Sequence, residues 1–216
     1  MVNTEYTTAD LGNFETSLRE TLLSFQGQNL PERLWAKDPS LWKNDPAVQE
    51  KIKNRLGWLS LAETMPDAIE TLSTFAASIK NEGFTDVLLL GMGGSSLCPE
   101  VLNQTFGPAP GYPRLTVLDT TDPETIMSAE KSCELKTTLF ILASKSGSTI
   151  EVMSLYRYFA GRLSTVVGNT LGKQFIAITD PGSPLETLAK EKGFRRIFST
   201  PPDVGGRYSA LTYFGL

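Results

Sequence analysis

From residue 86 onwards, short apolar runs alternate with segments of helical pattern, and this alternation restricts the possible folds more than any other feature. The runs are Asp86 to Leu90, Leu115 to Leu118, Leu139 to Ala143, Phe175 to Thr179 and Arg195 to Phe198. Apolar residues that follow one another without polar alternation predict strands buried on both faces, and the helices between them imply right-handed parallel crossovers. The sequence therefore predicts an α/β fold with a doubly wound, five-stranded parallel sheet. Ligands of such sheets bind at the carboxyl ends of the strands.

The residues before this pattern, 1–83, predict a helical extension, and residues 84–216 predict the α/β domain. Apolar residues spaced three and four apart indicate an amphipathic helix over residues 8 to 25. Two Asp-Pro pairs are typical of helix starts: Asp38-Pro39 and Asp45-Pro46. The second of these helices is expected to end at Gly57, and a further helix is expected from Pro66 to Lys80. Three tryptophans are expected to pack between these helices: Trp35, Trp42 and Trp58.

Charge and hydropathy exclude two classes of partner. The net charge of -4 leaves no basic patch for nucleic acid, although one local site for a small anion is compatible with it. No apolar run approaches the roughly 20 residues of a membrane span. The start of the chain lacks the basic and apolar regions of a signal peptide, so no membrane association and a cytoplasmic location are expected.

The residue types that are present also limit the chemistry. The sequence contains no histidine, which excludes a Ser-His-Asp triad and a histidine-based metal site within these residues. Cys98 and Cys133 have neither metal-ligand spacing nor a disulfide framework, and both are expected to be plain thiols in or near the core. Neither a metal nor a cofactor is predicted.

The loop after the third predicted strand has the composition of an anion site. Ser144-Lys145-Ser146-Gly147-Ser148-Thr149 runs from a buried strand directly into a helix. Hydroxyl groups, backbone N–H groups, the positive end of the helix dipole and the charge of Lys145 would then meet at one point, which suits a phosphate. The alternative is a simple βα loop in which Ser and Thr cap the helix.

The loop after the first predicted strand, Gly91-Met92-Gly93-Gly94-Ser95-Ser96, allows the backbone to come close to a ligand. With Asp119 at the end of the second strand, it admits a dinucleotide interpretation. The match is imperfect because Ser96 stands where the third glycine of G-x-G-x-x-G is expected.

The remaining strand ends differ in what they predict. Asp122-Pro123 is expected to cap a helix, and Thr179 to Pro184 reads as a structural turn. Arg207 follows the pair Gly205-Gly206, where a rigid loop could direct its guanidinium towards an oxyanion, or it is an ordinary surface arginine.

Four segments taken in order resemble the phosphoglucose isomerase family: GMGGSSL from residue 91, SKSGST from residue 144, ITDPGSPL from residue 178 and GGRYSAL from residue 205. They look like the first of that family's two sugar-isomerase (SIS) domains, which are flavodoxin-like. The helical part, with ERLWAKDPSLW and NRLGWL, is similar to the isomerase half of bacterial transaldolase/glucose-6-phosphate isomerase fusions.

The resemblance implies interconversion of glucose 6-phosphate and fructose 6-phosphate through an enediol. It implies substrate contacts from Gly94 and Ser95, and stabilisation of the enediolate by Arg207 as the catalytic residue. The implied phosphate loop consists of Ser144, Lys145, Ser146, Ser148 and Thr149. Ser96 and Gly147 depart from the family pattern, which often has Asp and a bulkier residue there.

The family's general base and its ring-opening histidine belong to the second SIS domain. We therefore expect this chain to be the N-terminal part of a longer enzyme, inactive alone and homodimeric when complete. Glu151, just after the phosphate loop, is expected to orient that loop rather than to replace the base. The alternatives are a stand-alone sugar-phosphate-binding module and, third, a dinucleotide-dependent enzyme.

Overall fold

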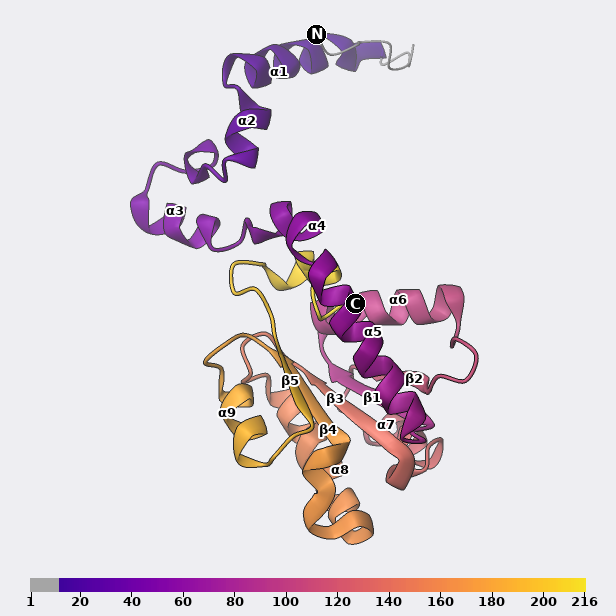
Figure 1. The fold of residues 1–216 in the computed structure, drawn as a ribbon. Coiled ribbons are helices and arrows are strands. Elements are labelled where there is room, and N and C mark those ends of the chain that lie inside the picture. The colour runs from indigo at the N-terminus through magenta and orange to yellow at the C-terminus, as the bar shows by residue number, and fades with distance from the viewer. Residues whose placement is uncertain (1–11) are drawn as a thin grey trace. The chain divides into compact units, whose positions relative to one another are not determined.

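The computed structural model describes residues 12–216 and is shown in Figure 1. By internal contacts the chain divides into two compact units, Met1–Lys53 and Asn54–Leu216. The division falls earlier than the boundary predicted near Gly83, because residues 66–81 form a helix that packs on the sheet.

The described part of the first unit is helical. A 3₁₀ turn, Gly12–Phe14, leads into α1 (Glu15–Gly27), and α2 (Leu30–Trp35) and α3 (Pro46–Lys53) follow, with a second 3₁₀ turn at Pro39–Leu41 between them. Of the helix predicted over residues 8 to 25, residues 8–11 lie outside the described residues.

Two expectations for the helical part differ from the structure. The helix that begins at Pro46, with Asp45 Oδ1 accepting from the Ala47 N–H at 2.8 Å, ends at Lys53 rather than at Gly57. The expectation that the tryptophans pack between helices is wrong for Trp35 and Trp42, which are 65% and 46% exposed. Trp58 stacks on the Tyr208 ring, with the ring centroids 5.5 Å apart.

The second unit is built on one sheet of five parallel strands, as the sequence predicts. They are β1 (Asp86–Gly91), β2 (Arg114–Leu118), β3 (Thr138–Ala143), β4 (Phe175–Thr179) and β5 (Arg196–Ser199), in the order β2-β1-β3-β4-β5. The three inner strands are buried nearly throughout because both faces of the sheet are covered, which is why their sequences show no polar alternation.

One face of the sheet carries three helices. They are α7 (Pro123–Lys131), α8 (Ile150–Val167) and α9 (Pro184–Glu191). Phe159 of α8 packs on Phe140 of β3, and Phe140 stacks on Phe175 of β4 with ring centroids 5.0 Å apart. This aromatic stack fixes α8, and with it the loop that enters α8, against the sheet.

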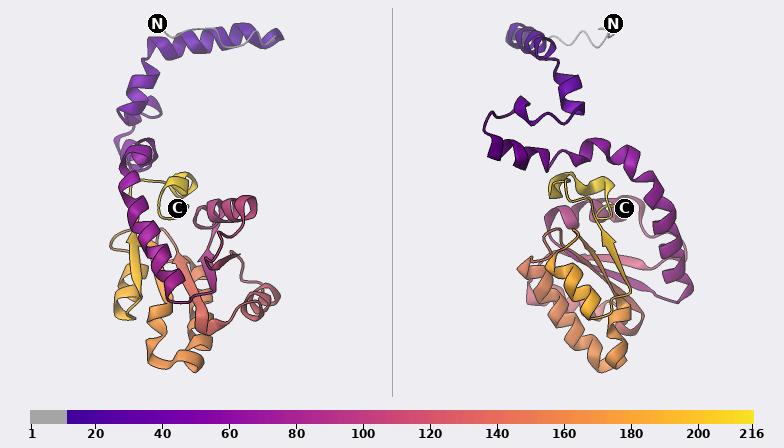
Figure 2. Two further views of the ribbon diagram at one scale, coloured as in Figure 1. Left: turned by 45° about the vertical axis from the view of Figure 1, so that its right-hand side comes forward. Right: turned by 60° about the vertical axis from the view of Figure 1, so that its left-hand side comes forward.

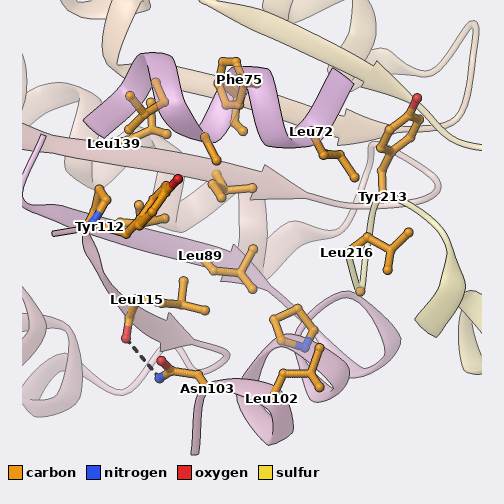
Figure 3. Close-up of a pocket in the computed structure, with 18 of the residues that line it drawn as sticks. Leu72, Phe75, Leu89, Leu102, Asn103, Tyr112, Leu115, Leu139, Tyr213 and Leu216 are labelled. Carbon is orange, nitrogen blue, oxygen red and sulfur yellow. Dashed lines mark hydrogen bonds between the residues drawn. The ribbon is translucent and has the colours of Figure 1, made fainter. Parts of the chain in front are cut away.

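The opposite face is covered by α5 (Pro66–Asn81) and α6 (Leu97–Phe106). Figure 2 shows α5 and the α8 and α9 pair on opposite sides of the strands. Between α5 and α6 lies an apolar groove of about 560 Å³ whose floor includes Leu89 and Leu139. In Figure 3 the walls carry Phe75 of α5 and Leu102 of α6, with Leu216 at one end.

The segment that precedes α5 is bound to the chain's last loop. It contains a 3₁₀ turn, Gly57–Ser60, and α4 (Leu61–Thr64). Leu56 and Val204 pair as an antiparallel bridge, and the Gly57 N–H donates to the Asp203 carbonyl at 3.0 Å. Within residues 12–216, no helix is long and apolar enough to cross a membrane.

Candidate functional site

A cavity of about 530 Å³ opens at the carboxyl ends of β1 and β3. At this point the chain order reverses, because β1 leads to β2 on one side while β3 leads to β4 on the other, and crevices form where such a reversal occurs. The residues that line it are Asn54, Arg55, Met92, Gly94, Ser95, Ala143, Ser144, Lys145, Ser146, Thr149, Asp180, Pro202 and Gly206.

The loop after β3 is held in a closed turn by its own hydroxyl groups. The Ser144 and Thr149 hydroxyls bond to each other at 2.8 Å, and Ser144 Oγ also accepts from the Gly147 N–H at 3.2 Å. Ser146 Oγ accepts from the N–H and the hydroxyl of Ser148. Three hydroxyl residues, Ser144, Ser146 and Thr149, therefore line the cavity in fixed positions.

The start of α8 differs from the starts of the other two helices on that face. Asp122 caps α7 by accepting from the Thr125 N–H at 2.9 Å, and Ser183 caps α9 by accepting from the Glu186 N–H at 3.1 Å, so both predicted helix starts are confirmed. At α8, Thr149 makes no side-chain cap. The first N–H groups of an 18-residue helix are thus left for another acceptor at the edge of the cavity.

Gly147 gives this loop its shape. Its φ of +68° is one that residues with a Cβ rarely adopt, and an added Cβ would lie 2.7 Å from the Leu185 nitrogen and 2.8 Å from Ser183 Oγ. A residue with a side chain therefore does not fit this arrangement, which accounts for the glycine at position 147.

Lys145 is bound to the loops after β4 and β5. Its Nζ donates to Asp180 Oδ2 at 2.6 Å and to the Pro202 carbonyl at 3.0 Å. Asp180 Oδ1 in turn accepts from the Thr200 hydroxyl at 2.6 Å. The full positive charge expected of Lys145 is therefore largely offset by Asp180, and the pair fixes three strand-end loops around the cavity.

The loop after β1 meets the loop after β5 at a pair of glycines. A Cβ on Gly94 would overlap the carbonyl oxygen of Gly206. The Ser209 hydroxyl donates to the Gly206 carbonyl at 2.7 Å and approaches the Gly94 carbonyl at 3.2 Å. Close backbone contact, rather than a dinucleotide, thus accounts for a glycine at position 94.

The cavity gathers six of the eight residues predicted for the site: Gly94, Ser95, Ser144, Lys145, Ser146 and Thr149. Ser148 and Arg207 do not line it: Ser148 is hydrogen-bonded to Ser146, and Arg207 follows Gly206 at the start of the 3₁₀ helix Gly206–Leu211. The Arg207 side chain is exposed and, within residues 12–216, has neither a hydrogen bond nor an ion pair. Glu151 and Asp119 do not line the cavity.

Three polar contributors to the cavity were not predicted. Asp180 lies in a turn for which the sequence predicts a structural role, and Asn54 and Arg55 lie in the segment NRLGWL, where the sequence predicts the end of a helix. Gly57, two residues after Arg55, lies against the loop that contains Asp203. A Cβ at position 57 would collide with the Asp203 carboxylate, so this close approach requires glycine. No cluster of three potential metal ligands occurs within the described residues.

Together, the fold and the cavity are those of a doubly wound α/β domain with a pocket of hydroxyl and backbone N–H groups at its topological switch point. Residues 60–216 match the family model for phosphoglucose isomerase. The chain belongs to the phosphoglucose isomerase family.

Its relatives and structural neighbours agree with this assignment. It is 34% identical over 163 residues to the glucose-6-phosphate isomerase of Thermus thermophilus, covering 74% of this chain and 38% of the relative. The enzyme of Carboxydothermus hydrogenoformans is 34% identical over 179 residues, which cover 78% of this chain and 38% of the relative. The chain thus spans well under half the length of these relatives.

Two crystal structures have the same arrangement. A hypothetical protein from Thermus thermophilus superposes with a TM-score of 0.72 at 30% identity, over 94% of this chain and 45% of that one. The glucose-6-phosphate isomerase of Chlamydia trachomatis superposes with a TM-score of 0.58 at 25% identity, over 84% of this chain and 33% of that one.

Proposed function

We propose that this chain is the sugar-phosphate-binding part of a glucose-6-phosphate isomerase, which interconverts glucose 6-phosphate and fructose 6-phosphate. The observation that carries the proposal is the uncapped start of α8 beside three cavity-lining hydroxyl residues. An anion at that position accepts hydrogen bonds from groups that lack a side-chain acceptor and meets the positive end of the helix dipole.

The remaining roles follow from the position of each group. Ser144, Ser146 and Thr149 hold the phosphate, while Gly94 and Ser95 contact the sugar across the cavity. Isomerisation moves a proton between C1 and C2 through an enediolate, and a preorganised cation stabilises the charge that develops on its oxygen. Arg207 supplies that cation in the complete enzyme, since no acidic partner holds it within the described residues.

The base that moves the proton lies, in this proposal, in a part of the longer enzyme that follows these residues. The chain alone is then expected to bind the sugar phosphate without turning it over. A cytoplasmic location, a homodimer in the complete enzyme and a fusion to a transaldolase part stay predictions.

Ligand-induced stabilisation tests the proposal. We expect fructose 6-phosphate to raise the midpoint of thermal unfolding of the 216-residue chain, because a ligand that binds the folded state alone stabilises it. Inorganic phosphate is expected to act more weakly and NAD not at all. A shift with NAD and none with the sugar phosphate would replace this proposal with a dinucleotide site.

Removing one phosphate-loop hydroxyl will weaken binding measurably. We expect Thr149→Val to cost about 1 kcal/mol or more of fructose 6-phosphate binding, roughly a fivefold to tenfold higher Kd by calorimetry. Thr149→Ser keeps the hydroxyl that bonds to Ser144 and is expected to bind as the unaltered chain does. Equal Kd values for the valine and serine variants would remove Thr149 from the phosphate site.

A further inference from the structure

The charges around the cavity leave one question open, which is what offsets the negative charge of a bound phosphate. Lys145 is already paired with Asp180 at 2.6 Å, and both side chains line the cavity. A phosphate monoester carries up to two negative charges near neutral pH. Neutral hydroxyls and a helix dipole worth about half a charge do not balance them.

Arg55 is the other cation on the cavity wall. Its Nη1 donates to the carbonyl of the adjacent Asn54 at 2.8 Å, and within residues 12–216 no carboxylate lies within ion-pair distance of it. Four of its five N–H donors are therefore available for an anion. The flat guanidinium can donate two parallel hydrogen bonds to one phosphate.

The backbone that carries Arg55 is fixed rather than loose. The next residue, Leu56, is 6% exposed and pairs with Val204, which is 2% exposed. The Gly57 N–H donates to Asp203, and the Trp58 ring stacks on Tyr208. The Arg55 stem passes beside Gly205, where an added Cβ would lie 3.2 Å from Arg55 Cδ.

The contact with Gly205 links Arg55 to the loop that carries two further residues of the proposed site. The loop that it touches carries Gly206, on the cavity wall, and then Arg207. A bound anion that draws in the Arg55 guanidinium would thus also hold the loop that presents Arg207.

We propose that Arg55 is a substrate-binding residue that recognises the phosphate group of the sugar phosphate by charge-assisted hydrogen bonds. The inference rests on the proposed function and adds a residue from outside the SKSGST loop. The Lys145 and Asp180 pair then orients the loops, while Arg55 contributes the net positive charge that selects a phosphorylated sugar.

Calorimetric titration of the 216-residue chain with fructose 6-phosphate, at low and at moderate salt, tests this role. We expect Arg55→Gln to raise the Kd about tenfold or more at low salt and to reduce its dependence on salt, because one charged contact is lost. Arg55→Lys keeps the charge but not the fork, so an intermediate Kd with nearly unchanged salt dependence is expected. Arg157→Gln removes an equal charge from an exposed site on α8 outside the cavity and is expected to change neither quantity.

The salt dependence separates recognition from a structural role. A variant that is merely less stable would show a lower unfolding midpoint without ligand but retain the salt dependence of the unaltered chain. That result, or an unchanged Kd in Arg55→Gln, would overturn the role of Arg55 while leaving the proposed function in place. Failure of the unaltered chain to bind fructose 6-phosphate would overturn both.

Discussion

We expect Arg207→Ala to lower the turnover number of the complete enzyme by about 100-fold or more, roughly 3 kcal/mol of transition-state stabilisation, with a much smaller change in KM. The reason is that the enediolate oxygen is negative in the transition state and neutral in the bound sugar. A cation at that oxygen therefore stabilises the transition state more than the ground state. Steady-state rates with fructose 6-phosphate give both parameters.

The surroundings of Arg207 allow a loss of turnover in this variant to be distinguished from a loss of stability. The Arg207 side chain is exposed and, within the described residues, makes no hydrogen bond or ion pair, so its truncation breaks none. Arg157→Ala, which removes an exposed arginine from α8, is the matched control and is expected to retain full turnover. Full turnover in Arg207→Ala as well would contradict the role given to Arg207.

Gly94→Ala is expected to damage the fold and the candidate site together. The added Cβ would overlap the Gly206 carbonyl oxygen, so the loops after β1 and β5 must separate. We expect the unfolding free energy to fall by about 2 kcal/mol or more and binding of fructose 6-phosphate to be lost with it. Denaturant unfolding and calorimetry measure the two effects.

A second glycine provides the control for that result. Gly161 lies within α8, and a Cβ there would meet no atom within 4 Å. Gly161→Ala should therefore stabilise the chain by about 0.5 to 1 kcal/mol, because alanine is the better helix former. A Gly94→Ala variant as stable as the unaltered chain would show that the two loops do not approach each other as described.

The sheet could be predicted from the sequence because its strands are buried on both faces. The predicted run Phe175 to Thr179 is the observed β4, and the predicted run at Asp86 to Leu90 extends by one residue to Gly91 in β1. That the loop after β3 borders a cavity could be predicted as well, because its residues are contiguous between a strand and a helix, whereas its binding of phosphate stays a proposal.

The contacts between segments far apart in the sequence could not be predicted in this way, because no local sequence pattern specifies them. The Lys145 and Asp180 pair joins residues 35 positions apart, and nothing in a lysine or in a TDPG turn specifies its partner. Arg55 reaches the cavity through pairing of Leu56 with Val204, which depends on how the last loop folds back. The exposure of Trp35 and Trp42 was missed because an aromatic residue in a helical segment is most often buried.

The crystal structure of this chain with fructose 6-phosphate tests the central claim most directly. The account predicts phosphate density at the start of α8, with its oxygens about 3 Å from the Ser146 and Thr149 hydroxyls and from the first N–H groups of the helix. Phosphate density elsewhere on the domain, with this cavity occupied by water, would contradict it.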